Sequence, residues 1–407
     1  MQSLQSNIAE EDGGEGVVCT GRTYLSADNH MTCRHVYTLA FSPLSQLLTP
    51  MFTSYFPLLL DYQMAQKQVI YDIGPFTSST KNTDTQLTVH VSNKRFKIDL
   101  FTSHFESSPA LLAEYLRHVQ RQEPEWIPDE SELDADGEFE DPLDEMHDWV
   151  LQPFLPIFRE IAPLDPSHNY TLEDCLFAEE LHYTVQVIDD NLVPVFLSST
   201  KNMKNDIIGA RLPSSVDCSM FPVYHPREVQ VPINTNSAAL PGIPRRVHIH
   251  GQSQPSFFKI VYGGDVGITT REIRTYAKIR MAKFDPPIFT SQLEGLVQND
   301  DGHVMGLVLS YIECDGATLY CIDGHDPKFS ELRQKWLDQI SRTLEQFHSH
   351  GIIWGDAKAA NVLIDVNEDA YLIDFGGGYT EGWVEKEKSN STEGDLQGLE
   401  NIKRYLF

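Results

Sequence analysis

Basic residues and long hydrophobic runs are both scarce in this chain. It contains 31 lysines and arginines against 59 aspartates and glutamates, a formal net charge of -28 at pH 7. Because phosphate backbones and anionic lipid surfaces repel an acidic protein, we expect neither nucleic acid nor a membrane among its partners. Apolar stretches such as residues 57–60 are also far shorter than the roughly 20 residues that span a bilayer.

Cysteine is sparse as well, and the sequence lacks the spacing of a metal site. The six cysteines are scattered without a CxxC pair, which excludes a zinc ribbon or the disulfide framework of a small secreted fold. His248, His250, His348 and His350 have no third ligand at metal-binding spacing, so we expect them to face solvent or cap helices. The first thirty residues are acidic and lack the apolar run of a secretory signal. These absences predict a cytoplasmic or nuclear protein.

The length of 407 residues exceeds what one hydrophobic core usually organises, so we expect more than one domain. Residues 1–34 are polar and glycine-rich and are predicted to form a disordered tail. Residues 35–230 are predicted to form a mixed α/β region with an acidic linker at about 123–148. A second domain is predicted over residues 231–407.

The acidic linker and its neighbouring elements follow from local patterns. Residues 123–148 contain thirteen carboxylates and no lysine or arginine, and this density of one charge favours a solvated segment. A partial calcium-loop match begins at Glu132, but its twelfth position is Leu143, which favours a plain acidic loop. Around the linker we predict helices and strands, with helices at 111–120 and 149–161 and strands at 68–73, 86–92, 95–101, 181–188 and 192–197.

A strand followed by a helix carries a lysine and a glutamate thirteen residues apart. Lys259 lies in the apolar stretch 257–261, and Glu272 lies in a segment with helical spacing. One interpretation is a lysine that binds nucleotide phosphates and is held by the helix carboxylate. The other is that Thr269 and Glu272 form a capping box while Lys259 is a surface residue. Taken alone, the pattern favours the second interpretation.

The motif that follows reverses this preference. After an amphipathic helix expected at 330–348, Asp356 is followed by Lys358 and Asn361, and a predicted strand pair then leads to Asp374 in an Asp-Phe-Gly sequence. Transfer of a γ-phosphoryl group requires a carboxylate near the attacking hydroxyl and a cation near the transferred oxygens. It also requires oxygen ligands for Mg²⁺. The four residues supply these groups.

This combination closely resembles the protein-kinase-like superfamily. The resemblance implies an α+β, two-lobed fold preceded by the mixed α/β N-terminal region. The small lobe, over residues 231–315, is expected to be five-stranded, and the helical lobe, over residues 316–407, is expected to be shortened.

The resemblance also implies a role for each candidate site residue. Asp356 and Lys358 become catalytic, and Asn361 and Asp374 become ligands of Mg²⁺. Lys259 and Glu272 become the ion pair that anchors the phosphates of ATP. Leu309 becomes the residue at the back of the adenine pocket, and Ser310, Tyr311 and Ile312 become the hinge that contacts adenine.

Three features depart from that superfamily. No GxGxxG precedes Lys259, so any lid over the phosphates must be built differently. Trp354 and Gly355 precede Asp356 where typical protein kinases have His and Arg, and Gly-Asp is similar to the aminoglycoside and choline phosphotransferase branches. Only 33 residues follow Asp374, without an Ala-Pro-Glu motif, although Asp395 lies in a helix similar to the one that braces the catalytic loop.

The sequence therefore predicts a phosphotransferase that uses ATP and Mg²⁺ and acts on a hydroxyl of a protein Ser/Thr or of a small molecule. The alternative is a catalytically weak pseudokinase that senses nucleotide or serves as a scaffold, and the missing glycine loop and short helical lobe favour it. The whole chain resembles a group of uncharacterised kinase-like proteins of fungal genomes, for example over residues 378–384. The first 225 residues resemble only that group.

Overall fold

The computed structural model describes most of the chain from residue 71 onward. The described residues are 17–19, 71–79, 81–123, 126, 141–200, 207–233, 238–314, 316, 318–322 and 326–407. The predicted disordered tail lies outside them except for residues 17–19, and so do residues 127–140 of the predicted acidic linker.

The first unit is built on a six-stranded sheet in the order β1-β2-β3-β4-β5-β6. Its strands are β1 (Val17–Cys19), β2 (Asp72–Ser79), β3 (Thr85–Val91), β4 (Lys94–Leu100), β5 (Glu179–Ile188) and β6 (Asn191–Thr200). Neighbouring strands pair antiparallel except β4 and β5, which are parallel. A parallel pair needs a long crossover, and the helices between β4 and β5 form it. The β5–β6 hairpin turns at Asp189 and Asp190, both with positive φ, as a two-residue hairpin turn requires.

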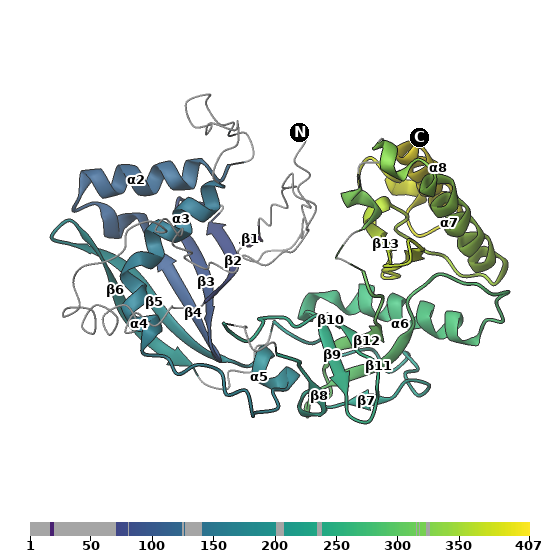
Figure 1. Cartoon of the computed structure of the whole chain (residues 1–407), viewed down its shortest axis with the longest axis horizontal. Coiled ribbons are helices and arrows are strands. Elements are labelled where there is room, and N and C mark those ends of the chain that lie inside the picture. Colours follow the sequence, from purple (N-terminus) through teal and green to yellow (C-terminus); the bar gives the residue numbers. More distant parts are fainter. Residues whose placement is uncertain are drawn as a thin grey trace, which may run out of the picture.

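Helices cover the apolar face of this sheet (Figure 1). They are α2 (Pro109–Gln120), α3 (Pro142–Leu151) and α4 (Leu155–Arg159). Alternate strand residues such as Leu87 and Phe96 are fully buried against Met146 and Phe158 of the helices. The sheet and helices therefore enclose a hydrophobic core of their own.

The structure confirms most predicted elements of this unit and corrects two of them. Of the strand predicted at 68–73, residues 68–70 lie outside the described residues, and the strand that the structure contains, β2, runs from Asp72 to Ser79, past the predicted end. The helix predicted from residue 149 begins earlier, at Pro142, inside the acidic segment. Asp141 caps it, since its carboxylate accepts a hydrogen bond from the Leu143 amide at 2.8 Å. Proline at the first helical position and carboxylates in the first turn favour this start.

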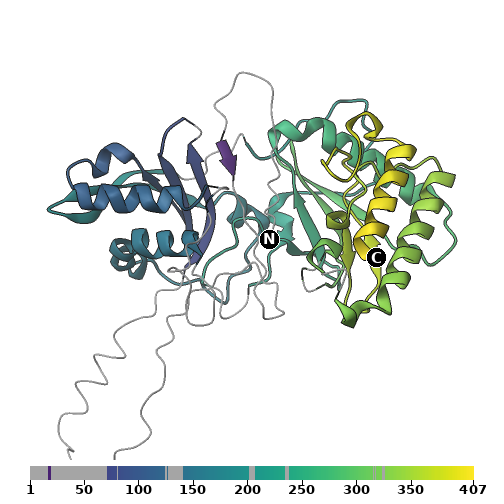
Figure 2. The same ribbon diagram turned by 90° about the horizontal axis from the view of Figure 1, so that it is seen from above.

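A short helix between β4 and β5 of the first sheet packs against the second unit. Helix α5 (Leu172–Leu176) starts with a capping box in which Thr171 and Asp174 bond each other's backbone amides. Its buried residues Leu172 and Leu176 belong to a second core, together with Phe258 and Val308 of the next sheet. Figure 1 shows α5 between the two sheets, and Figure 2 shows the two units side by side from above.

The second unit contains a six-stranded sheet in the order β7-β11-β12-β10-β9-β8. Its strands are β7 (Val223–Tyr224), β8 (Val229–Gln230), β9 (Arg246–Ile249), β10 (Ser256–Ile260), β11 (Leu293–Gln298) and β12 (Val304–Ser310). Strands β8 to β12 form the antiparallel five-stranded run that the sequence predicts. Strand β7 adds a sixth strand, parallel to β11, and both β7 and β8 precede residue 231.

One helix lies along the other face of this sheet, and two further helices and a strand pair group together beyond it (Figure 1). They are α6 (Val266–Met281), α7 (Leu332–Ser349), α8 (Thr392–Leu406), β13 (Val362–Ile364) and β14 (Ala370–Leu372). The core includes Ile273 of α6, Ile340 of α7 and Ile402 of α8, all with no exposed surface. Within the described residues no helix has the length and apolar character needed to cross a bilayer.

Candidate active site

Three charged side chains from separate parts of the second unit meet at one point. Lys259 on β10 places its Nζ 2.9 and 2.8 Å from the two carboxylate oxygens of Glu272 on α6. The same Nζ lies 2.9 Å from Oδ1 of Asp374, which follows β14. The lysine therefore bridges two carboxylates that are far apart in the sequence.

The local structure explains why these side chains converge. Phe258 is buried in the core on the outer face of the sheet, so its neighbour Lys259 points to the face that α6 covers. Helix α6 begins at Val266, well before Thr269, so the capping-box interpretation of Thr269 and Glu272 is wrong. Glu272 lies in the middle of the helix on its buried side and is 2% exposed. It is positioned to hold the lysine.

Burial and charge compete in this cluster. Burial alone would lower the pKa of Lys259, but the carboxylates of Glu272 and Asp374 outweigh it, and the pKa is raised. Burial would raise the pKa of Asp374, but the nearby ammonium of Lys259 outweighs it, and the pKa is lowered. Glu272 is the most buried of the three, and its pKa is raised by desolvation. The Lys259–Asp374 pair is therefore charged at neutral pH.

A second cluster surrounds Asp356. Lys358 places its Nζ 2.7 Å from Oδ2 of Asp356, and Asn361 donates its side-chain amide to the same carboxylate at 3.2 Å and to the Asp356 carbonyl at 2.9 Å. The hydroxyl of Thr380 donates to Oδ1 of Asp356 at 3.1 Å and accepts from Nζ of Lys358 at 2.8 Å. The side chains of Lys358, Asn361 and Thr380 therefore all contact the Asp356 carboxylate.

The loop that carries Asp356 is held by a buried aspartate from α8. Asp395 is 1% exposed, and its two oxygens accept the amides of Trp354 and Gly355, each at 2.8 Å. Its Oδ2 also lies 2.9 Å from Nε2 of His348. This contact corrects the expectation that His348 faces solvent or caps a helix. Because buried carboxylates require partners, these contacts hold the loop in one position.

The same loop is tied to the segment that precedes Asp374. The indole nitrogen of Trp354 donates to the carbonyl of Ile373 at 2.9 Å, and the Ile373 amide donates to the carbonyl of Asn361 at 3.1 Å. Asp374 itself has a φ of 61°, an uncommon conformation for a residue other than glycine. The charge of Lys358 contributes to the lowered pKa of Asp374. The hydrogen bonds of Ile373 with Trp354 and Asn361 join the two clusters.

The donor atoms near Asp374 and Asn361 fit magnesium. Both residues offer hard oxygen ligands, a carboxylate and an amide carbonyl, and the Ile373–Asn361 hydrogen bond brings them together. Among the residues that the structure covers, no group of three or more His, Cys, Asp or Glu could hold a metal ion by itself. This set suits Mg²⁺, which takes one or two carboxylates and completes its shell with phosphate oxygens and water.

The segment predicted to contact adenine ends β12. Leu309 is buried in the core with α6, and Ser310 pairs with Gln292 through its amide, at 2.8 Å, and its hydroxyl, at 2.9 Å. Tyr311 lies beneath the guanidinium of Arg246 from β9, 5.1 Å from its ring centroid. Ile312 follows at the end of this segment and is half-buried. Phe257 lies directly opposite Leu309 in the sheet register, two residues before Lys259.

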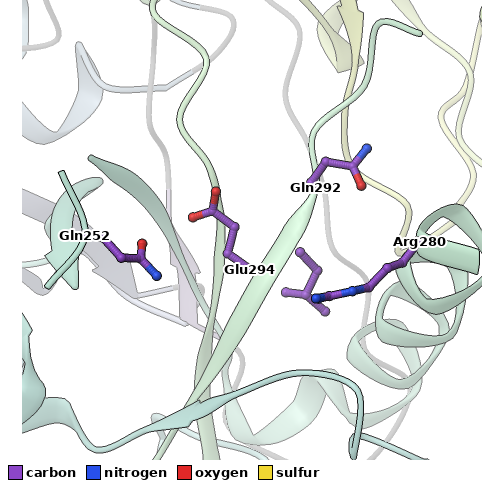
Figure 3. Close-up of a pocket in the computed structure, with 5 residues that line it drawn as sticks. Gln252, Arg280, Gln292 and Glu294 are labelled. Carbon is purple, nitrogen blue, oxygen red and sulfur yellow. The ribbon is translucent and has the colours of Figure 1, made fainter. Parts of the chain in front are cut away.

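A surface pocket lies beside this segment (Figure 3). It is lined by Gln252, Arg280, Gln292, Leu293 and Glu294 and includes none of the predicted site residues. Gln292 connects it to the Ser310 end of β12. The pocket therefore borders the predicted adenine segment at Gln292, and none of its lining residues belongs to the two charged clusters.

Sequence patterns missed two residues of this site. Thr380 contacts both Asp356 and Lys358, and Arg271 on α6 donates to the carbonyl of Gly376 at 2.9 Å. A hydroxyl residue soon after a run of three glycines was the available signal for Thr380. Arg271, one residue before Glu272, had no distinguishing signal because arginine is common on exposed helix faces.

Comparison with known proteins gives partial and distant matches, and no family model matches the chain. A probable serine/threonine-protein kinase of Arabidopsis thaliana is 29% identical over 127 residues, 27% of this chain and 18% of that protein. A probable cyclin-dependent kinase of Dictyostelium discoideum is 36% identical over 106 residues, 26% of this chain and 27% of that protein. A mitogen-activated protein kinase of Candida albicans is 31% identical over 105 residues, 25% of this chain and 26% of that protein.

These matches support a protein-kinase-like superfamily. The chain spans about a fifth to a quarter of the length of the curated relatives it matches. The mixed α/β architecture, with a sheet covered by helices, is compatible with a kinase-like fold.

Proposed function

We propose that the second unit is a phosphotransferase that moves the γ-phosphoryl group of Mg²⁺-ATP to a hydroxyl. The observation that carries the proposal is the bridge from Lys259 to both Glu272 and Asp374, formed while Asp356, Lys358 and Asn361 are in mutual contact. A half-buried lysine between two carboxylates has little value for stability, because desolvation of the charges offsets much of their attraction. Such a cluster is better explained as a site for an anionic ligand and its metal.

Each side chain has a role in this proposal. Lys259, held by Glu272, binds the phosphates, and Leu309 with the Ser310–Ile312 segment contacts the base. Asp374 and Asn361 hold Mg²⁺, which supplies charge neutralisation on the phosphate oxygens when it is bound.

Asp356 orients the acceptor hydroxyl and receives its proton, and Lys358 stabilises the negative charge on the transferred group. In the structure Lys358 lies 2.7 Å from the Asp356 carboxylate, so one residue pair supplies both the base and the cation. Acceptors of this chemistry are Ser/Thr hydroxyls of a protein or a small-molecule alcohol.

Binding and transfer are tested separately. Mg²⁺-ATP at 100 times its dissociation constant should raise the free energy of unfolding by about 2.7 kcal/mol. Phosphate transfer to protein and small-molecule acceptors should fall by about 10² to 10⁴ in Asp356→Asn, which removes the base. Asp338→Asn is the matched control, because Asp338 is exposed on α7 and contacts Gln334. Equal transfer by wild type and Asp356→Asn across all acceptors would refute the proposal.

A nucleotide-sensing or scaffolding role is the second candidate. The lack of a GxGxxG motif before Lys259 favours it. The side chains around the proposed adenine site also favour it, because Phe257 lies opposite Leu309 and Arg246 stacks on Tyr311. Under this role Mg²⁺-ATP would still raise the melting temperature, and wild type would transfer no more phosphate than Asp356→Asn.

A further inference from the structure

The first unit covers one face of the sheet that carries Lys259. Phe258, the residue before Lys259 on β10, is 1% exposed, and its core also contains Leu172 and Leu176 of α5. Helix α5 lies between the two sheets (Figure 1). Because neighbouring residues of a strand point to opposite faces, the packing of Phe258 sets the position of Lys259 on the other face. The lysine of the proposed function therefore depends on a core that the first unit shares.

Helix α5 is itself held by both units. Arg95 on β4 donates to the carbonyl of Cys175 at 3.0 Å and to the carboxylate of Glu180 at 2.8 Å. That carbonyl lies in the last turn of α5, where backbone carbonyls have no partner within the helix. From the second unit, Nε of Arg227 lies 2.9 and 2.8 Å from the two carboxylate oxygens of Glu173. These bonds keep α5 at a fixed place against Phe258.

A second contact joins the first sheet to residues 238–242, which lead into β9. The amide of Ser92, between β3 and β4, donates to the carbonyl of Ala238 at 3.1 Å, and the Ser92 carbonyl accepts the amide of Leu240 at 2.8 Å. Leu240 is 3% exposed and lies in the same core as Phe258. The segment is thus bonded to the first sheet through its backbone and packed on the second sheet through its side chain.

A buried histidine determines how closely this segment approaches. His90 on β3 is 7% exposed, and its ring lies against two glycines, Gly74 and Gly242. A Cβ at Gly74 would lie 2.9 Å from its Nε2, and a Cβ at Gly242 would lie 2.7 Å from its Cε1. Since the ring is packed on both glycines, it cannot yield easily to an added atom. A methyl group at residue 242 would therefore push residues 238–242 away from the first sheet.

We infer that the first unit is the positioning partner of Lys259, and that through α5 and residues 238–242 it holds β9 and β10 where the lysine meets the phosphates of Mg²⁺-ATP. The inference rests on the proposed function, which assigns the phosphates to Lys259. Gly242 and His90 are positioning residues, because they act through the two strands. The loop that carries Asp356 is held separately, by Asp395 of α8.

The test is Gly242→Ala in the full-length chain, with the affinity for Mg²⁺-ATP measured by isothermal titration calorimetry. The methyl group should displace the segment and weaken binding about tenfold, as the loss of one good contact does. Adding His90→Ala removes the ring that the methyl group meets and should restore the affinity. Gly267→Ala is the matched control, because a Cβ there would have no atom of the described residues within 4 Å, and it should bind like wild type.

A double-mutant cycle with Lys259→Met separates positioning from a general loss of structure. If the contact acts through the lysine, Gly242→Ala should weaken binding in wild type and leave the weaker binding of Lys259→Met unchanged. Leu240→Ala, which removes packing without a clash, is a second variant and should behave in the same way. Equal losses of affinity in both backgrounds would overturn the inference, because the effect would then not pass through Lys259.

Hydrogen exchange of the nucleotide-free chain measures the placement of the strand directly. Gly242→Ala should speed the exchange of the amides of residues 256–260, and the double variant with His90→Ala should restore their protection. Gly267→Ala should leave exchange as in wild type. Unchanged exchange in both Gly242→Ala and Leu240→Ala would overturn the inference.

Failure of this inference can be told from failure of the proposed function. If wild type binds Mg²⁺-ATP and transfers phosphate while Gly242→Ala and Leu240→Ala bind as tightly, the inference is overturned and the proposed function stands. A loss of affinity that persists when His90→Ala is added also overturns it, because the contact with His90 is then not the cause. If wild type does not bind Mg²⁺-ATP, both are overturned.

Discussion

The two sheets of this chain use charged residues in opposite ways. In the first sheet, charges pair with the adjacent strand, as Lys94 does with Glu179 and Arg95 with Glu180. These residues are direct register neighbours on β4 and β5. In the second unit, Lys259 instead reaches Glu272 on a helix and Asp374 after a distant strand. Cross-strand pairing satisfies charges locally, whereas convergence from three elements leaves a site that a ligand can complete.

Among the variants that test this comparison, the largest expected effect comes from Lys259→Met, which breaks the convergent cluster. Loss of a group that stabilises phosphate charge should lower transfer by about 10² to 10³. Glu272 would remain buried without its cation, at a cost of about 2 kcal/mol in the free energy of unfolding. This figure is below the value for a fully buried pair because the Lys259 side chain is 29% exposed.

Chemical denaturation and a transfer assay measure these two effects of Lys259→Met. Adding Glu272→Gln should restore stability but not transfer, because the uncompensated carboxylate is then removed while the phosphates still lack their cation. If the double variant also regained transfer, the cluster would be structural and the comparison of the two sheets would fail.

Asp395→Asn should have the next largest effect. The carboxylate accepts two backbone amides and contacts His348, and an asparagine offers only one acceptor oxygen in its place. We expect a loss of about 2 kcal/mol, the cost of leaving a buried donor unsatisfied. Transfer should fall with it, because Asp356 follows the two amides directly. Hydrogen exchange at Trp354 and Gly355 would measure the loosening, with Asp338→Asn as the control that should leave it unchanged.

The first sheet is expected to lose stability in acid through a buried histidine. Burial, with the charges of Arg95 and Lys97, lowers the pKa of His90 from 6.5 to about 3. The unfolded chain therefore binds a proton between these pH values that the folded chain does not, so stability falls as the pH drops from 6.5 toward 3. The maximum slope is about 1.4 kcal/mol per pH unit.

Denaturation at several pH values between 4 and 7 checks this prediction. His90→Asn should flatten the pH dependence, and His250→Asn, at an exposed position, should leave it as in wild type. An unchanged slope in His90→Asn would show that other groups carry the acid sensitivity of this sheet.

The smallest effect is expected from Lys94→Met. Its ion pair with Glu179 is partly exposed, with 26% and 15% of the two side chains accessible, and such pairs contribute about 0.5 kcal/mol. Transfer should not change, because the pair lies in the other sheet. A loss of stability as large as that of Lys259→Met would contradict the distinction between locally paired and convergent charges.

Some features could be predicted from short stretches of sequence. The apolar stretch around Lys259, the helical spacing around Glu272 and the pattern before Asp374 predicted a strand, a helix and a strand pair, which the structure contains. Helix α3 was predicted to begin seven residues too late, because the density of carboxylates outweighed the capping signal of Asp141 and Pro142 in the sequence. The end of strand β2 was predicted six residues too early, because residues 74–79 lack a strand pattern and are extended through pairing with β3.

The amino-acid order alone specified which residue types could perform phosphoryl transfer, since period, capping and motif spacing depend on residues close along the chain. It could not specify that Thr380 contacts Asp356, or that Asp395 holds the loop before it. Those contacts depend on where three glycines direct the backbone and on how α8 packs against the loop. A contact between residues distant in sequence is set by the folded path of the whole unit, and no local pattern records that path.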